Sequence, residues 1–405
     1  MSTELLYHGF GLRGYRHVKT YLRDGRMIVR VEPTAEDLRC VLCGSRHVVR
    51  RGAYRRRYRG VPVGSCPVWI ELDVPRVGCL DCGAVRQARM KFAEERRSYT
   101  KTFERYVLEL SRYMTIQDVA RHLEVSWNMV KDIQQRSLTK RYGKISLRHL
   151  THLAVDEICI GRGHRYLTVV LDLVSGAVVF VGNGKGADAL KPFWKRLHGS
   201  HAKIQAVAMD MSPAYIHAVT KNLPKAAIVF DHFHIVKLFN EKLSDLRREL
   251  YREAKDLLHK DVLKGTRWLL LKNPENLDAS ANEAARLQEA LRLNQPLATA
   301  YYMKEDLRQV WEQFGKRAAR KLLNDWIRRA EASGIRILIK FAHTLAMHRT
   351  GILAFYDHGA ISTGPLEGTN TKIRVLQHQA YGFRDTEFFK LKIYALHESK
   401  LKLVG

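Results

Sequence analysis

The stretch HLAVDEICIGRGHRYLTVVLDLVSGAVVFV, residues 152–181, decides the fold class. Apolar and β-branched residues fill it in three runs, which is the pattern of three consecutive strands. The first run nevertheless carries two adjacent carboxylates, Asp156 and Glu157. Because side chains alternate along a strand, Asp156 shares a face with Ala154 and Ile158, and Glu157 points outward. A carboxylate on a packed face is costly without a partner, and a divalent cation is such a partner.

The residues after this stretch continue as an α/β pattern. From residue 150 to 236 the predicted order is strand-strand-strand-helix-strand-helix-strand. Asp210 ends the fourth strand, IQAVAMDM, directly before a helix start at Ser212 and Pro213. Either acid alone suits a strand end or a cap. Together, on adjacent strands, Asp156 and Asp210 predict a shared Mg²⁺ site.

The chain carries a large positive charge. Its 405 residues include 69 Lys and Arg against 41 Asp and Glu, which gives a formal net charge of +28 and a pI of about 10. Basic clusters lie at residues 50–60, 101–106, 247–255 and 315–321. A solvated helix face accounts for any one cluster, but the total predicts a polyanionic partner that touches several faces.

The sequence shows no sign of a membrane or secretory segment. No apolar run approaches the roughly 18 residues of a membrane span, and the first residues, MSTELLYHGFGLRG, do not resemble a signal peptide. We therefore expect a cytoplasmic protein that makes no membrane contact and whose thiols stay reduced. Its six cysteines are expected to be metal ligands or core residues.

Four of the cysteines form two C-x-x-C-G knuckles, at residues 40–44 and 79–83. Each glycine lets its turn close so that backbone amides point at sulfur, and four thiolates complete a tetrahedral zinc site. We therefore predict a structural zinc ribbon with the ligands Cys40, Cys43, Cys79 and Cys82. The alternatives are a redox or core pair at one knuckle and a ligand role for His47. Cys66 and Cys159 are expected in the core.

Residues 114–136, MTIQDVARHLEVSWNMVKDIQQR, have the spacing of a helix-turn-helix. Ala120 is the small residue where the two helices approach, and Ser126 is placed to cap the second helix, from about Trp127 to Gln135. That helix would lie in a DNA major groove, although a plain helical hairpin would give the same spacing. The basic context favours DNA, with candidate contacts from Ser126, Asn128, Lys131 and Gln135.

A third acid lies towards the C-terminus. Glu367 follows a Gly-Pro break in GAISTGPLEGTNTKIRVLQHQAYGFRD, residues 359–385, near the start of a predicted helix. A glutamate there would also suit the helix dipole alone. Candidate contacts to a DNA backbone follow it at Asn370, Lys372 and Arg374.

The run DHFH after the last predicted strand contains Asp231, His232 and His234. These side chains either support metal ligation or DNA positioning, or form a hydrogen-bonding cluster at a strand–helix junction. Asp231 is the substitute ligand if Asp210 is not one. Trp268, beside three leucines, is expected in the core, and the alternative is stacking on a distorted base.

Together these motifs resemble a known family. VDEICIGRGHRY, AMDMSPAY, DHFHIVK and STGPLEGTNTKIRVLQHQAYGFRD follow the order and style of the ISL-three family of insertion-sequence transposases, which are of the DDE class. With the cysteine knuckles and the helix-turn-helix in front, the resemblance covers essentially the whole chain. We find no departure from it at Asp156, Asp210 or Glu367.

The resemblance implies a multidomain α/β fold with a zinc ribbon, a helix-turn-helix and an RNase H-like mixed sheet interrupted by an all-helical insertion. The implied parts are a zinc-ribbon module (1–98), the helix-turn-helix (99–145), the first part of the catalytic core (150–237), the helical insertion (238–345) and the final part of the core with the Glu helix (346–405).

The resemblance also implies an activity. Asp156, Asp210 and Glu367 would hold two Mg²⁺ ions, or Mn²⁺, for DNA strand cleavage and strand transfer. The partners would be double-stranded DNA of the inverted repeats and the target, bound by a homodimer or higher oligomer at the nucleoid. A transposase-derived DNA-binding regulator without catalysis and a metal-dependent nuclease are the competing hypotheses.

Overall fold

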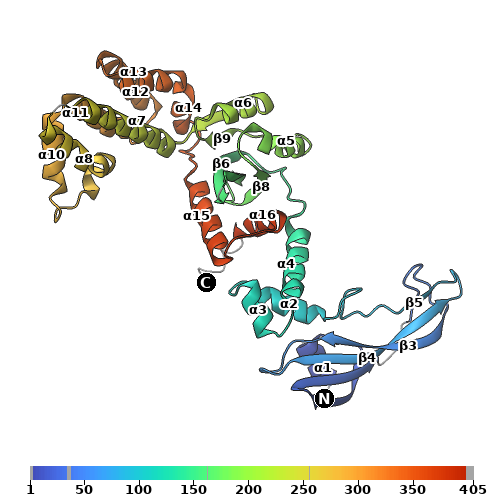
Figure 1. Cartoon of the computed structure of the whole chain (residues 1–405). Helices are drawn as coiled ribbons and strands as arrows, with labels where there is room; N and C mark the ends of the chain where they lie inside the picture. The colour runs from blue at the N-terminus through green and yellow to red at the C-terminus, as the bar shows by residue number, and fades with distance from the viewer. Residues whose placement is uncertain (1–2, 34–37, 162, 255, 398–405) are drawn as a thin grey trace. The chain divides into compact units, whose positions relative to one another are not determined.

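The structure, a computed structural model, describes residues 3–33, 38–161, 163–254 and 256–397. The chain divides into two compact units, residues 1–143 and 144–405 (Figure 1). Each unit contains a five-stranded sheet with both parallel and antiparallel neighbours. The fold class is therefore multidomain α/β.

The first unit begins with a sheet of order β1-β2-β4-β3, in which β5 also pairs with β4. Strand β2 runs parallel to β4, and the other neighbours are antiparallel. Leu6 and Phe10 of the first helix pack against Val29 and Ile70 of the sheet. The elements are α1 (Thr3–Phe10), β1 (Tyr15–Arg23), β2 (Arg26–Pro33), β3 (Val48–Arg59), β4 (Val68–Cys79) and β5 (Val85–Gln87).

Three helices complete this unit: α2 (Lys101–Leu110), α3 (Ile116–His122) and α4 (Trp127–Tyr142). Their shared core contains the apolar residues that the helix-turn-helix pattern requires, including Val119, Ala120, Leu123, Val130 and Ile133. The predicted cap is confirmed, because the Ser126 hydroxyl accepts the Met129 N–H at 3.2 Å. The second helix is longer than predicted, ending at Tyr142.

The second unit contains a sheet of order β10-β9-β6-β7-β8. Strands β6, β7 and β8 are antiparallel neighbours, whereas β6, β9 and β10 run parallel. The predicted order of strands and helices is thus confirmed. The elements are β6 (His152–Gly161), β7 (Arg165–Asp172), β8 (Val178–Asn183), α5 (Lys191–His198), β9 (Ala206–Met209), α6 (Pro213–Asn222) and β10 (Ala227–Phe230), with a 3-10 turn at Ala187–Leu190.

Helices cover both faces of this sheet. Leu153 and Val155 of β6 lie in a core with α5 and α6. Ala154 and Ile158 lie in the opposite core, with α15 (Gly364–Gln379) and α16 (Thr386–Tyr394). The alternation predicted for β6 is confirmed, and Asp156 belongs to the face that α15 covers.

A helical body follows β10 directly (Figure 1). Its core joins distant helices through contacts such as the edge-on packing of Phe239 against Trp326 and Phe341. Its helices are α7 (His232–Glu253), α8 (Leu257–Gly265), α9 (Arg267–Leu271), α10 (Glu283–Leu293), α11 (Gln295–Arg308), α12 (Lys316–Ala332), α13 (Arg336–Met347) and α14 (Arg349–Leu353), with 3-10 turns at Pro274–Asn276, Gln309–Trp311 and Ala354–Tyr356.

Two expectations about the core are wrong. Trp268 is 65% exposed, because α9 turns Leu269 and Leu270 inward instead. Cys159 is exposed and Cys66 half-buried. Cys159 lies on the α5 and α6 face of β6, where the buried core ends at Val155.

Among the described residues, no helix is long and apolar enough to span a membrane.

Candidate active site

Asp156 is a half-buried carboxylate in the middle of β6. Its Oδ1 accepts the Glu157 N–H at 2.7 Å, and its Oδ2 accepts the Asn370 Nδ2–H of α15 at 2.8 Å. Burial raises the pKa of Asp156, and the nearby Asp210 adds to that rise, although the Glu157 amide and His234 oppose it. An ionised Asp156 is therefore costly without a cation nearby.

Asp210 comes next to Asp156 through strand register. Ala154 of β6 pairs with Ala208 of the parallel strand β9, and each acid lies two residues further along its strand. Neighbouring strands are about 4.8 Å apart, so the two carboxylates extend from adjacent positions. Asp210 Oδ1 accepts the Ser212 N–H at 3.0 Å, which fixes the turn into α6.

Asp231 is the third acid in this row, because Phe230 of β10 pairs with Met209 of β9. Asp231 is only 2% exposed. Its Oδ2 accepts a 2.8 Å hydrogen bond from His234 Nδ1, and its Oδ1 accepts the Thr363 N–H at 3.4 Å. Burial alone would raise the pKa of Asp231, but the bonds from His234 and Thr363 outweigh it and lower that pKa.

The two histidines of DHFH have different surroundings. The hydrogen bond to Asp231 raises the pKa of His234, and Asp156 and Asp210 lie near enough to add to the rise. Burial lowers the pKa of His232. Its ring packs against Phe233 and Trp311, which links the strand end to the helical body. His234 thus lies near all three acids, whereas His232 lies near Asp231, with its Nδ1 3.8 Å from Asp231 Oδ1.

Glu367 lies in the first turn of α15 and is exposed. Leu366 and Ile373 of the same helix are fully buried against the sheet. Asn370, one turn after Glu367, is the α15 residue that contacts Asp156. The structure thus places Asp156, Asp210 and Asp231 at neighbouring positions on three adjacent strands, without their ligand atoms all lying within 4.8 Å of one another, and places Glu367 one helical turn from a contact to Asp156. Sequence reasoning missed this contact, because nothing local links two residues so far apart in the chain.

The four knuckle cysteines converge on one point. Their sulfur atoms all lie within 4.8 Å of one another, and they are the one such group of three or more Cys, His, Asp or Glu among the described residues. The Sγ atoms of Cys40 and Cys82 are 3.6 Å apart, and those of Cys43 and Cys79 are 3.5 Å apart. Zn–S bonds of about 2.3 Å in a tetrahedron require about 3.8 Å between sulfurs.

Both knuckles have the same backbone. Gly44 and Gly83 have φ of 75° and 68°, in the left-handed region, and each N–H bonds the carbonyl of the first cysteine of its knuckle. Backbone amides of Cys43 and Leu42 lower the pKa of Cys40 to about 6, whereas hydrogen bonds with neighbouring cysteine sulfurs raise the pKa of Cys43 and of Cys82, so the four sulfurs share their protons. His47 instead lies with its Nδ1 3.3 Å from Asp81 Oδ1. The donor set therefore suits zinc.

The candidate DNA contacts differ in exposure. Ser126 and Asn128 are exposed at the start of α4, although the Ser126 hydroxyl is engaged in the cap. Lys131 and Gln135 are half-buried, and the Lys131 ammonium lies 5.8 Å from the centre of the Trp127 ring. On α15, Arg374 is exposed, Lys372 is half-buried and Asn370 is buried.

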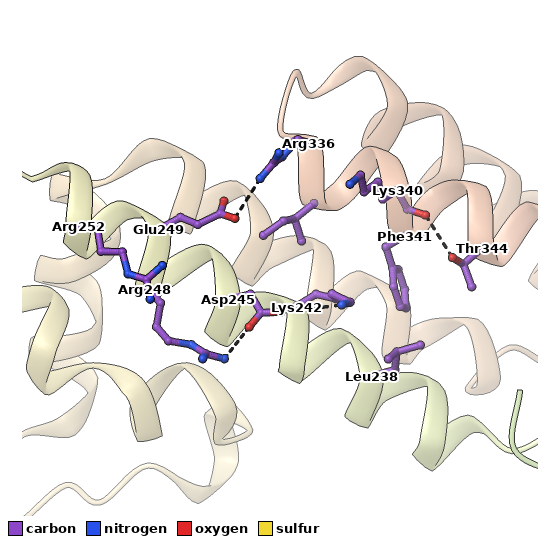
Figure 2. Close-up of a pocket in the computed structure, with 11 residues that line it drawn as sticks. Leu238, Lys242, Asp245, Arg248, Glu249, Arg252, Arg336, Lys340, Phe341 and Thr344 are labelled. Atoms are coloured by element: carbon purple, nitrogen blue, oxygen red, sulfur yellow. Dashed lines mark hydrogen bonds and ion pairs between the residues drawn. The ribbon is translucent and has the colours of Figure 1, made fainter. Parts of the chain in front are cut away.

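A basic groove of about 410 Å³ lies between α7 and α13 (Figure 2). Asp245 pairs with Arg248 at 2.5 Å, and Glu249 pairs with Arg336 at 3.2 Å. Five cationic side chains thus face two carboxylates: Lys242, Arg248, Arg252, Arg336 and Lys340.

Comparisons with known proteins agree with this architecture. A family model for the DDE domain of ISL3 elements, described as "Transposase", matches residues 153–393. A second model, "Helix-turn-helix domain of transposase family ISL3", matches residues 88–137.

Similar proteins include transposases of insertion sequences. The transposase for insertion sequence element IS1001 of Bordetella parapertussis is 34% identical over 370 residues, 91% of this chain and 90% of that protein. The transposase for IS1557 of Mycobacterium tuberculosis is 31% identical over 391 residues, 90% of this chain and 87% of that protein.

Among solved structures, the Drosophila P element transposase strand transfer complex matches with a TM-score of 0.40 and 11% identity, over 74% of this chain and 92% of that chain. The DDE family model and the two insertion-sequence transposases each extend over most of the chain. The chain therefore belongs to the ISL3 family of DDE transposases, which are polynucleotidyl transferases acting on DNA.

Proposed function

We propose that Asp156, Asp210 and Glu367 are the catalytic carboxylates of this transposase and hold two Mg²⁺ ions, which Mn²⁺ can replace. The register that sets Asp156 beside Asp210 on adjacent parallel strands carries the proposal. Carboxylate oxygens are the ligands that Mg²⁺ prefers, and a cation would relieve the cost of ionising Asp156. When bound, such ions activate an attacking water or 3′-hydroxyl and stabilise the leaving oxygen of a phosphodiester.

Asp231 has another role in this proposal. Both of its oxygens accept hydrogen bonds, from His234 and from the Thr363 N–H. Thr363 directly precedes α15, so this bond anchors the end of the helix that carries Glu367. Among the described residues, Asp210 accepts a side-chain hydrogen bond only at Oδ1, so its Oδ2 makes it the better candidate ligand. Asp231 and His234 support the site by holding α15 beside the strand edge.

We propose an RNase H-like catalytic core of residues 150–237 and 346–405, with residues 238–345 as a helical insertion. Three antiparallel strands followed by two parallel ones, in the order β8-β7-β6-β9-β10, support it. Helix α7 begins directly after Asp231, next to the carboxylates, and runs from the core into the insertion. DNA bound at the acids would therefore meet the helical body.

The first unit binds the terminal inverted repeats in this proposal. Residues 1–98 form a zinc ribbon on Cys40, Cys43, Cys79 and Cys82, and residues 99–145 present α4 to a major groove. Exposed Asn128 is the best-placed side chain for base contacts. Arg50 and Arg51 of β3 are exposed and suit the phosphate backbone, whereas Arg55 is paired with Asp73 at 2.9 Å.

In the second unit, Lys372 and Arg374 of α15 and the groove between α7 and α13 offer further contacts to DNA phosphates. We propose a homodimer or higher oligomer on DNA, because transposition brings two ends to one target. The protein would then act at the nucleoid.

Joining a labelled element end to a target duplex in Mg²⁺ tests the proposal. A transposase converts the end into a joined product, whereas a nuclease yields only shorter fragments and a DNA-binding regulator yields neither. Wild-type protein that binds the ends but forms no joined product would overturn it.

A further inference from the structure

The side chain of Asn370 is buried beside the proposed catalytic carboxylates and only half satisfied. It is 5% exposed, and its Nδ2 donates a 2.8 Å hydrogen bond to Asp156 Oδ2. Its other polar atom, Oδ1, is buried and has no hydrogen-bond partner. A buried amide oxygen without a partner is costly, and native structures seldom retain one unless water, an ion or a ligand satisfies it.

Attachment of α15 to β6 does not explain this amide. Gln377, two turns further along α15, already bonds the helix to the strand, through its Nε2 and the Ile160 carbonyl. Leu366 and Ile373 add fully buried apolar contacts against the sheet. An apolar side chain at position 370 would continue that contact without leaving an oxygen unpaired. An apolar side chain there would, however, leave Asp156 Oδ2 without the donor that Asn370 supplies, so the amide acts on Asp156 and not only in packing.

The way in which Asp156 is held suggests the role of the Asn370 amide. Oδ1 accepts the Glu157 N–H at 2.7 Å, and Oδ2 accepts the Asn370 Nδ2–H, so the carboxylate is held from two sides. Side chains that hold a metal-binding carboxylate tune both its direction and its affinity for the metal. Amide oxygens are themselves hard ligands for divalent cations or for the water molecules such cations carry.

We infer that Asn370 is a positioning residue of the divalent-metal site. Its NH₂ group holds Asp156 for the cation, and its unpartnered oxygen receives the cation or a cation-bound water. The inference rests on the proposed function, because it assumes that Asp156 and Asp210 bind the metal. It assigns Asn370 to the metal site and not to a direct contact with DNA.

The test is Mn²⁺ binding to the full-length, zinc-loaded protein without DNA, measured by electron paramagnetic resonance of free Mn²⁺. Asn370→Ala should weaken binding roughly ten- to a hundredfold, as loss of such supporting groups generally does. Gln377→Ala is the matched control, since it removes another α15–β6 hydrogen bond and should leave Mn²⁺ affinity unchanged. Equal affinity in wild type and Asn370→Ala, or an equal loss in both variants, would overturn the inference.

Asn370→Asp distinguishes the role of the side-chain oxygen at position 370 from the role of the NH₂ group that donates to Asp156. This variant keeps an oxygen but sets a second negative charge against Asp156, so its metal-free melting temperature should fall. Mn²⁺ should then raise the melting temperature by more than it does in wild type, because the cation relieves the repulsion. A smaller rise than in wild type would overturn the role given to the oxygen.

Asp156→Ala separates this inference from the proposed function. If Asp156→Ala binds Mn²⁺ as wild type does, the proposed metal site fails and the inference with it. If Asp156→Ala loses Mn²⁺ while Asn370→Ala keeps it, the site stands and only the inference fails.

Discussion

Asp156 on β6 and Asp210 after β9 occupy equivalent positions on neighbouring parallel strands, each two residues beyond the Ala154–Ala208 pair. One short strand of four residues, β9, thus sets the spacing between two acids. Asp231, directly after β10, continues the row and accepts a hydrogen bond from the Thr363 N–H, next to the start of α15. The register of three strands therefore sets the positions of the acids, and the attachment of α15 sets the position of the helix that carries Glu367.

Zinc removal should unfold the cysteine knuckles and leave the second unit folded. Cys40→Ser should lower the zinc content below the expected one ion per chain and increase proteolysis within residues 38–87, because zinc binding there is coupled to folding. Cys66→Ser and Cys159→Ser are the matched controls, since neither lies in the cluster. Full zinc content in Cys40→Ser, measured by atomic absorption, would contradict this account.

Two substitutions at the start of α4 should affect folding stability and DNA recognition separately. Ser126→Ala should cost about 1 kcal/mol of stability, because it removes the cap on the Met129 amide. Asn128→Ala should change stability by less than about 0.5 kcal/mol. It should nevertheless reduce discrimination between the element's end and unrelated DNA by about 1–3 kcal/mol.

Chemical denaturation and competition binding measure the two effects. Gln117→Ala, at an exposed position of α3, is the control and should change neither. If Asn128→Ala binds with unchanged specificity, α4 does not read the groove through this residue.

The Asp231–His234 pair predicts a pH-dependent contribution to stability. The raised pKa of His234 means that its contribution is complete below its ordinary value of 6.5 and lost as pH rises through the folded value. The lowered pKa of Asp231 means that its contribution is complete above its ordinary 3.8 and lost as pH falls through the folded value. The pair should stabilise the fold most between about pH 4 and 6.5.

The free energy of unfolding, measured without added divalent metal, checks this. Wild type should exceed His234→Gln by about 1.5–3 kcal/mol near pH 6, the usual range for a hydrogen bond to a charged group. The difference should narrow above neutral pH. A difference that stays constant from pH 5 to 9 would show that the pair does not titrate in this way.

The groove between α7 and α13 should contribute to DNA affinity through phosphate contacts. Arg252 and Lys340 line it, and neither forms an ion pair within the part of the chain that the structure describes. If both contact phosphates, Arg252→Ala/Lys340→Ala should reduce the slope of log K against log salt by about 1.8, since each contact contributes about 0.9. Lys264→Ala/Arg292→Ala removes the same charge from exposed positions outside the groove. An equal change in both variants would mean that net charge, not the groove, is responsible.

Local patterns predicted much of this protein. The alternation of β6, the helix-turn-helix core and the Ser126 cap depend on neighbours within a few residues, and the structure confirms them. The two cysteine knuckles are predictable from the sequence because each C-x-x-C turn is followed by its own glycine. Trp268 was placed wrongly because α9 is only five residues long, and its periodicity alone did not show which side faces the helical core.

The contacts that define the site could not be read from local patterns. The Asn370–Asp156 and Thr363–Asp231 hydrogen bonds join α15 to residues more than a hundred positions earlier. Strand order, which puts β6 between β7 and β9, brings these segments together. Asn370 looked like a surface amide beside basic residues, and only the packing of α15 shows that it is buried.

The most direct test of the central claim is cleavage of the element's own end DNA in Mg²⁺ by wild type and by Asp156→Asn, Asp210→Asn and Glu367→Gln. Each variant should bind the end with wild-type affinity and lose cleavage roughly a thousandfold or more, because metal-ion catalysis supplies several kcal/mol and each 1.4 kcal/mol is tenfold. Asp231→Asn should retain more activity than any of the three. Full cleavage by Asp156→Asn or Asp210→Asn would contradict the assignment of the acids.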